Sequence, residues 1–283
     1  MCNAFSFVVH RNGKVYWKFG IDSHSDIIEK FGLSEKNTCL AEIIPKKDKD
    51  YLGALKPSEK YWKFSFDEKN KELWHQECPE WWKASHEKHS WEAFRQWFKE
   101  LDKILIRKKI IHPFKNIKPP KRITRKHIEL LKQWASVWDS VGASVWASVW
   151  DSVGASVGDS VGASVWVSVW DSVGASVGDS VWASVWVSVR DSVYGYAGSF
   201  FRIKKWKYIK HKPYEYPFES VVKLWEQGLV PVFDGEKWML LGGKKAEVLF
   251  EIEAKELKKF SKGEALRKQE ALRKAEGKGE VKG

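Results

Sequence analysis

The chain has 283 residues and a formal net charge of +12, which is long enough for two or three modest domains, each with its own core. No basic segment followed by an apolar run opens the sequence, and no apolar run approaches the roughly twenty residues that a membrane helix needs. Its three cysteines are widely spaced, as is typical of reduced thiols. We therefore expect a cytoplasmic protein with no cofactor and no membrane contact.

The chain opens with Met1-Cys2, which exposes a terminal cysteine once the initiator methionine is removed. Such a residue carries both a thiol and a free amine, the pairing that N-terminal nucleophile enzymes use. The start resembles the "MCG" opening of class II glutamine amidotransferases and of proteins that crosslink abasic DNA, although Asn3 replaces the glycine. Cys2 is therefore a candidate nucleophile, with a buried cysteine in an edge strand as the alternative.

Residues 1–117 are predicted to form a small α+β domain. The expected elements are a hairpin within residues 1–20 that turns at Asn12-Gly13, a helix from a Ser25 cap to Gly32, strands at 38–45 and 61–67, and a long amphipathic helix within 79–105. The long helix carries Trp91, Phe94 and Trp97 at helical spacing, which is typical of a core-facing stripe.

Four residues near the start of this helix are candidate zinc ligands: His75, Cys78, His86 and His89. Zinc accepts such ligands, and two histidines three positions apart can share a helix face. The spacing matches no familiar zinc finger, and His86-Glu87-Lys88-His89 is one residue short of the H-E-x-x-H protease pattern. Polar histidines on a helix surface are the alternative, and we expect no metal.

Two basic clusters flank an acidic middle. Residues 118–135 are expected to be a linker with an entry helix, and residues 134–201 contain six aspartates but only one arginine. The first cluster comprises Arg107, Lys108, Lys109, Lys115, Lys118, Lys121, Arg122, Arg125 and Lys126; the second comprises Arg202, Lys204, Lys205, Lys207, Lys210 and Lys212. Basic residues mixed with aromatic ones such as Trp206 and Tyr208 permit a nucleic-acid partner, for which Arg202, Lys204, Lys205 and Lys207 are the candidate contacts. A merely solvated surface is the alternative.

Between the clusters, Ser-Val recurs every four residues, fifteen times from Ser136 to Val193. In one long helix each valine would drift by about 40° from the last, so no single face would be buried. In one long strand the valines would share a face with the fourth residue of each tetrad, which is aspartate six times. The pattern therefore predicts a turn in every tetrad, and a β-solenoid over residues 136–201 with valine inside.

Coils of 12 residues are favoured over coils of 16. Residues 151–170 and 171–190 match at eighteen of twenty positions, which indicates duplication rather than a 20-residue coil, because such a coil would stack aspartates. The fold class expected is thus mainly β, a tetrapeptide-repeat solenoid between two small α+β modules. At its corners stand seven tryptophans that would form an exposed interaction surface: Trp138, Trp146, Trp150, Trp166, Trp170, Trp182 and Trp186.

After the array, residues 202–260 are predicted to form a second small module. "YGYAGSFF" at its entrance has the character of a solenoid cap, followed by a helix within 217–228 and a three-stranded meander over 229–252. Residues 261–283 are expected to be a charged, disordered tail.

Three motifs carry a family resemblance: the "MCNA…GKVYWK" opening, the Ser-Val tetrads, and "LW..GLVP.FDG..W" over residues 224–238. In these the chain resembles a group of uncharacterised phage and environmental prokaryotic proteins. The resemblance implies no activity and carries over no functional residue.

The leading hypothesis for function is a non-enzymatic scaffold whose Trp-rich solenoid binds a protein partner or a second copy of the chain. One alternative is an N-terminal-cysteine enzyme or DNA-crosslinking protein that uses Cys2, with the solenoid as a spacer. Another is a sequence-independent nucleic-acid binder that uses the basic flanks. Ice binding is disfavoured because the succession of Trp and Gly is irregular.

Overall fold

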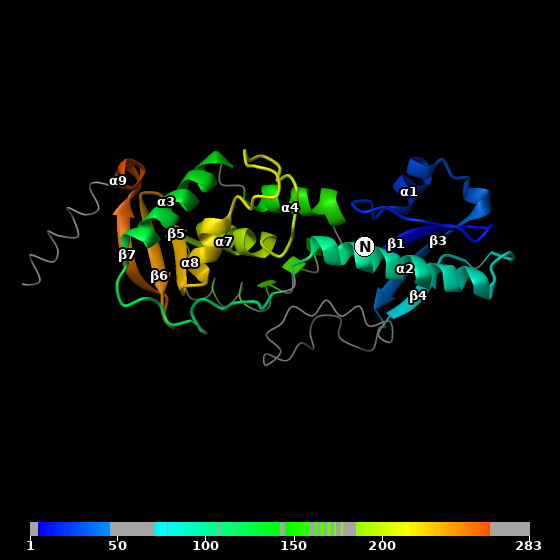
Figure 1. Ribbon diagram of the computed structural model, residues 1–283, viewed down its shortest axis with the longest axis horizontal. Helices are drawn as coiled ribbons and strands as arrows, with labels where there is room; N and C mark the ends of the chain where they lie inside the picture. The colour runs from blue at the N-terminus through cyan, green and yellow to red at the C-terminus, as the bar shows by residue number, and fades with distance from the viewer. Residues whose placement is uncertain are drawn as a thin grey trace, which may run out of the picture.

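The computed structural model describes residues 5–45 and 71–260, apart from positions 78, 107, 116 and 142–144 and some positions in the middle of the array. The latter are 159–161, 164, 167–168, 171–172, 174–176 and 178–184. Cys2, Cys78, Trp182, the strand expected at 61–67 and the tail after 260 therefore lie outside the described residues. Within the described part, two antiparallel sheets stand at opposite ends of the molecule with helices between them (Figure 1).

The first end of the molecule is a four-stranded sheet of order β2-β1-β3-β4. Its elements are β1 (Phe5–His10), β2 (Val15–Tyr16), helix α1 (His24–Phe31), a 3-10 turn (Glu35–Asn37), β3 (Thr38–Pro45), β4 (Lys71–His75) and helix α2 (Ala84–Ile104). The predicted hairpin, the strand at 38–45 and the long amphipathic helix are confirmed, and β4 is an addition to them.

Aromatic packing holds this end together. Phe5 of β1 lies with its ring centroid 5.0 Å from that of Trp97 on α2, and both side chains are buried. Helix α1 is capped by Ser23, whose hydroxyl accepts from the backbone N–H of Asp26, so the expected Ser25 cap is two residues too late. The aromatic stripe of the long helix is therefore core, as predicted.

The other end is the predicted meander, a sheet of order β5-β6-β7 that is contacted by α7 (Trp186–Gly198) and by three further helices. Its strands are β5 (Leu229–Phe233), β6 (Lys237–Gly242) and β7 (Glu247–Glu253), and the helices are α3 (Arg125–Ser140), α8 (Glu219–Trp225) and α9 (Ala254–Lys259). Helix α3 is tied to this end by side chains: His127 Nε2 lies 2.9 Å from Gln227 Oε1, and Asp139 pairs with Lys258 at 2.8 Å.

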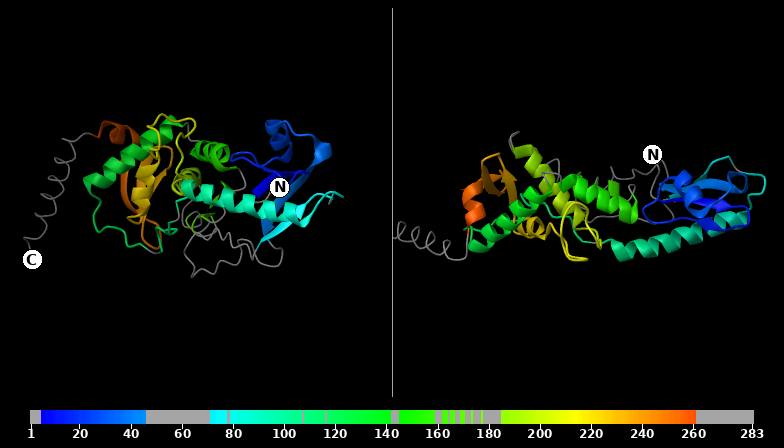
Figure 2. Two further views of the ribbon diagram at one scale, coloured as in Figure 1. Left: turned by 45° about the vertical axis from the view of Figure 1, so that its right-hand side comes forward. Right: turned by 90° about the horizontal axis from the view of Figure 1, so that it is seen from above.

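The prediction of a β-solenoid, and with it of a mainly β protein with coils of 12 residues, is wrong. The described part of the array forms the end of α3 and helices α4 (Val145–Val157) and α7 (Trp186–Gly198), and the described positions between Gly158 and α7 are helical as well. The segment expected to cap the solenoid, residues 194–201, is instead the buried end of α7 and the three buried residues that follow it. Figure 2 shows α4 and α7 between the two sheets from two further directions. In the described part of the chain, the protein is α+β and contains no solenoid.

In one long helix the drift of the valines would leave no single buried face, but this drift stays small within a short helix. Over the three tetrad steps of α4 the valines drift by only about 120°, which a single buried face accommodates. Successive residues are about 100° apart, so the fourth residue of a tetrad lies opposite its valine. The four valines of α4 are buried, whereas Asp139, Ala155 and Val187, all fourth residues, are exposed. A helix thus separates the valines from most of the fourth residues without any turn.

The serines of the array have a role that the four-residue spacing makes possible. Ser152 Oγ donates to the carbonyl of Ser148 at 2.5 Å, and Ser156 Oγ donates to that of Ser152 at 2.7 Å. These are bonds between positions i and i−4, which satisfy a buried hydroxyl inside its own helix. Elsewhere the serines bond neighbouring segments: Ser188 Oγ accepts from the N–H of Phe233, and Ser192 Oγ accepts from the indole N–H of Trp225.

Replacing Gly158 with alanine should destabilise the protein by about 2 kcal/mol or more. Gly158 follows α4 with φ +92°, and an added Cβ would lie 2.3 Å from Asp22 Oδ1 of the first domain, so backbone strain and a clash combine. The control is Gly235→Ala, because Gly235 has φ +109° with no atom within 4 Å of the added Cβ. Thermal unfolding should show the larger decrease in stability at Gly158, and equal decreases would contradict the contact between Asp22 and the end of α4.

In the part of the chain that the structure describes, no helix combines the length and apolarity required to traverse a lipid bilayer.

Candidate nucleic-acid interface

A loop between α7 and α8, residues 202–217, gathers the second basic cluster and is called the basic loop below. Its six cations are all exposed: Arg202, Lys204, Lys205, Lys207, Lys210 and Lys212. Glu215 is the single carboxylate within it. In Figure 1 the basic loop is the yellow segment that runs beside α4.

The basic loop is anchored to the core by Trp206, which is fully buried. The Trp206 ring meets those of Tyr216 and Phe218 edge-on, with centroids 5.1 and 6.1 Å away. Its backbone N–H donates to His211 Nε2 at 2.7 Å, and His211 Nδ1 donates to the carbonyl of Lys212 at 2.7 Å. Both nitrogens of this histidine are thus used to hold the loop, which makes His211 a structural residue.

Two serines of the tetrad array, both in α4, hydrogen-bond the backbone of the basic loop. Ser148 Oγ donates to the carbonyl of Lys207 at 2.6 Å, and the N–H of Lys207 donates to Ser152 Oγ at 2.7 Å. Beside them, the hydroxyl of Tyr208 donates to Asp151 Oδ2 at 2.6 Å, a bond that raises the pKa of the tyrosine. The repeat therefore fixes the backbone from which Lys207 projects.

A second set of bonds closes the far side of the basic loop. The N–H of Tyr214 donates to the carbonyl of Lys204 at 3.1 Å, and the hydroxyl of Tyr216 donates to the carbonyl of Gly195 in α7. At the start of the loop, the N–H of Arg202 donates to the carbonyl of Ile104 at 2.6 Å. Because its backbone is bonded at both ends and in the middle, the loop presents its cations from a fixed framework.

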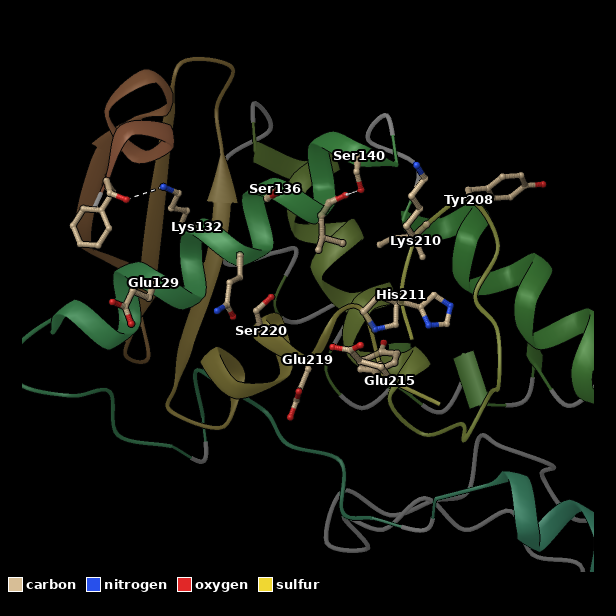
Figure 3. A pocket seen from close by; sticks show the side chains of 16 residues that line it. Glu129, Lys132, Ser136, Ser140, Tyr208, Lys210, His211, Glu215, Glu219 and Ser220 are labelled. Atoms are coloured by element: carbon tan, nitrogen blue, oxygen red, sulfur yellow. Dashed lines mark hydrogen bonds between the residues drawn. The ribbon is translucent and has the colours of Figure 1, made fainter. Parts of the chain in front are cut away.

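A cavity of about 1020 Å³ lies between the basic loop and α3 (Figure 3). It is lined by Glu129, Lys132, Gln133, Ser136, Val137, Ser140, Tyr208, Ile209, Lys210, His211, Glu215, Tyr216, Pro217, Glu219, Ser220 and Phe260. Three of its charged groups are bonded within the fold: Glu129 bonds Arg125 at 2.9 Å, Glu219 pairs with Lys223 at 2.8 Å, and Lys132 donates to the carbonyls of Lys258 and Phe260. Tyr208 extends outward at its rim, so the cavity opens beside the basic loop.

The first basic cluster starts next to the second but then leaves it. Leu105 and Phe201 form a β-bridge, and Lys108 Nζ donates to Ser199 Oγ at 2.6 Å. Lys108 is turned inward toward the rings of Tyr196 and Phe200, and burial lowers its pKa. The following residues run along the lower side of the molecule in Figure 1, away from the basic loop. The two clusters therefore do not form one continuous basic surface.

Most of the tryptophans predicted to form an exposed surface are only partly exposed. Trp146 is exposed, whereas Trp138, Trp150, Trp166, Trp170 and Trp186 are half-buried. Five of these six rings form one chain of contacts with Tyr194, in the order Trp150, Trp146, Tyr194, Trp166, Trp170, Trp186. Trp138 packs instead on Phe233 and Trp238. The third positions of the described tetrads thus pack helices against each other, and the described part of the array has no solenoid corners, on which the predicted surface depended.

The histidines singled out as zinc ligands are held by the backbone. His86 accepts from the N–H of Lys83 at Nδ1, has Nε2 3.2 Å from the carbonyl of Arg11, and lies against the rings of Trp81 and Trp82. His89 Nδ1 lies 3.0 Å from the carbonyl of Gly13. His75 bonds the carbonyl of Gln76 and lies 5.0 Å from the ring of Trp82. Among the described residues no group of three potential ligands is placed to hold a metal.

Sequence reasoning identified the cations of the basic loop but not its framework. Trp206 was expected to share the surface and is buried, while Tyr214, which no pattern marks, is exposed. Comparison with protein-family models, curated proteins and solved structures gives no match to the chain.

Proposed function

We propose that the basic loop binds nucleic acid through the phosphate backbone without reading the base sequence. The observation that carries this proposal is the set of six exposed cations on one loop, whose backbone is bonded to α4 and to the end of α2 and whose Tyr216 hydroxyl is bonded to α7. A solvated lysine surface has no need of such a framework. A framework that fixes the cations lowers the entropy lost when they bind phosphates.

The hypothesis of a Trp-rich protein-binding scaffold is no longer supported by an exposed tryptophan surface. That hypothesis required tryptophans at exposed solenoid corners, and of the six that the structure describes only Trp146 is exposed. The distribution of charge now favours the nucleic-acid alternative. It differs in one respect from the expectation of a polyanion bound only at the two ends of an acidic array, because the basic loop lies directly on α4 and its Lys207 pairs with Asp151 at 3.9 Å.

The test replaces three cations of the basic loop and measures how affinity depends on salt. Lys204→Gln, Lys205→Gln and Lys207→Gln together should weaken binding to an unrelated set of oligonucleotides to the same degree. The slope of log K against log salt should also fall, by about 0.7 for each phosphate of a single strand that the protein no longer neutralises.

The matched control changes the same charge elsewhere. Lys244→Gln, Lys245→Gln and Lys255→Gln remove three exposed lysines from the β6–β7 turn and α9. Affinity and slope should stay near those of the unaltered protein. An absence of binding at about 50 mM salt, or an equal decrease in affinity in the two triple variants, would show that the basic loop is only solvated surface.

A further inference from the structure

Two tyrosines of the basic loop are exposed in an unusual backbone conformation. Tyr208 and Tyr214 are 63% and 64% exposed, with φ angles of +65° and +62°. Residues with a side chain rarely adopt this left-handed conformation, which glycine or asparagine adopts at lower cost. Strain of this kind, on exposed aromatic side chains, points to a function for the rings rather than to a role in folding.

Each tyrosine is held within the basic loop or against α4 by a specific bond. The hydroxyl of Tyr208 is bonded to Asp151, so its ring is fixed at one end and open to solvent. The N–H of Tyr214 is bonded to the carbonyl of Lys204, which brings the backbone of Tyr214 beside that of Lys204. Both tyrosines therefore stand where a chain of phosphates, if bound by the basic loop, would pass.

We propose that the basic loop selects single-stranded nucleic acid, with unpaired bases stacked on Tyr208 and Tyr214. This inference rests on the proposed function and specifies its ligand. Aromatic rings bind bases of any sequence, because every base presents a π face, and lysines beside them hold the backbone. A duplex keeps its bases stacked on each other, so it offers the loop only phosphates.

The experiment compares a single strand of mixed sequence with its duplex at one salt concentration. Tyr208→Leu and Tyr214→Leu together remove both rings but keep apolar side chains, and each ring removed should lower the affinity for the single strand about tenfold. The affinity for the duplex and the salt slope of both should be unchanged. The paired control, Tyr208→Phe with Tyr214→Phe, keeps the rings and should retain the preference for the single strand.

A second measurement locates the stacked bases directly. A single strand that carries 5-iodouracil, irradiated in complex with the full chain, should crosslink to the peptides that contain Tyr208 or Tyr214. A crosslink confined to Trp146 would overturn the inference, as would an equal decrease in single-strand and duplex binding in the leucine variant. Tyrosine-dependent binding to vesicles with anionic lipid, without binding to the oligonucleotide, would overturn it in favour of a membrane.

The two proposals fail in different ways. If the unaltered protein binds neither strand nor duplex, the proposed function is wrong. If it binds both and the lysine variant binds neither, but the leucine variant binds like the unaltered protein, phosphate binding stands and stacking does not.

Discussion

Replacing Val157 with aspartate should unfold the protein, whereas the same replacement at Val187 should be tolerated. Val157 is 2% exposed on the inward face of α4, where an ionised carboxylate has no partner and loses its hydration. A cost above about 4 kcal/mol is a large part of the 5–15 kcal/mol that holds an ordinary domain together. Val187 is the fourth residue of its tetrad in α7 and is 49% exposed, so its carboxylate would stay in water.

The measurement is urea unfolding followed by far-ultraviolet circular dichroism. The Val157→Asp protein should show no cooperative transition or a much lower midpoint, and the Val187→Asp protein a stability within about 1 kcal/mol of the original. The folded spectrum itself should be dominated by helix. Similar decreases at the two positions would mean that the tetrads are not sorted into buried and exposed sides as in α4 and α7.

Replacing Asp191 with asparagine should remove a step from the dependence of stability on pH. Asp191, on α7, is 1% exposed; Oδ2 accepts from the indole N–H of Trp138 at 2.9 Å, and among the described residues Oδ1 has no partner. Burial raises the pKa of this carboxyl from 3.8 to about 6, opposed by the bond from Trp138 and by the charge of Arg190. The folded protein therefore binds this proton more tightly than the unfolded chain does.

The raised pKa determines the direction in which stability changes with pH. A carboxyl whose pKa is raised on folding gives its full stabilisation below the unfolded pKa and loses it as pH rises through the folded pKa. The stabilisation through Asp191 alone should total about 3 kcal/mol, at about 1.4 kcal/mol per pKa unit, and about 2 kcal/mol of it should be lost between pH 4 and pH 6. The asparagine variant should lack this fall and be the more stable protein at pH 8.

The control for Asp191→Asn is Asp139→Asn. Asp139 is also the fourth residue of a tetrad, but it is exposed and paired with Lys258. Its replacement should leave the fall between pH 4 and pH 6 in place. Chemical denaturation at several pH values gives the comparison, and an unchanged pH profile in the Asp191 variant would show that folding does not raise the pKa of this carboxyl.

The elements outside the array could largely be predicted from the sequence because their patterns are local. The Asn12-Gly13 turn, the aromatic stripe of α2 and the two turns of the meander each have one ordinary interpretation. The prediction for the array was wrong because only one long helix or one long strand over its whole length was compared with a solenoid, and several short helices were not considered. The inward valine and the mostly outward fourth residue were inferred correctly, but α-helices that break after three or four tetrads produce the same sorting as a turn in every tetrad.

The candidate site could be predicted only in part. A cluster of lysines is visible in any sequence, and the second cluster is the basic loop. Its framework depends on contacts between distant residues: Ser148 and Ser152 with Lys207, Tyr216 with Gly195, and Arg202 with Ile104. No local pattern assigns a left-handed conformation to Tyr208 and Tyr214 either, since tyrosine is not a residue typical of it.

The serine hydrogen bonds of α4 and α7 fix the position of individual tetrads relative to neighbouring segments. A coil added to a solenoid leaves its neighbours undisturbed, so the copy number of such a repeat can change freely. Here Ser148 and Ser152 are hydrogen-bonded to the basic loop, while Ser188 is bonded to β5 and Ser192 to α8. One inserted tetrad in α4 would shift the residues beyond it by about 6 Å along the helix and turn them by about 40°. Tetrads of identical composition are therefore not interchangeable within α4 or α7, and gain or loss of a copy inside either helix would break these contacts.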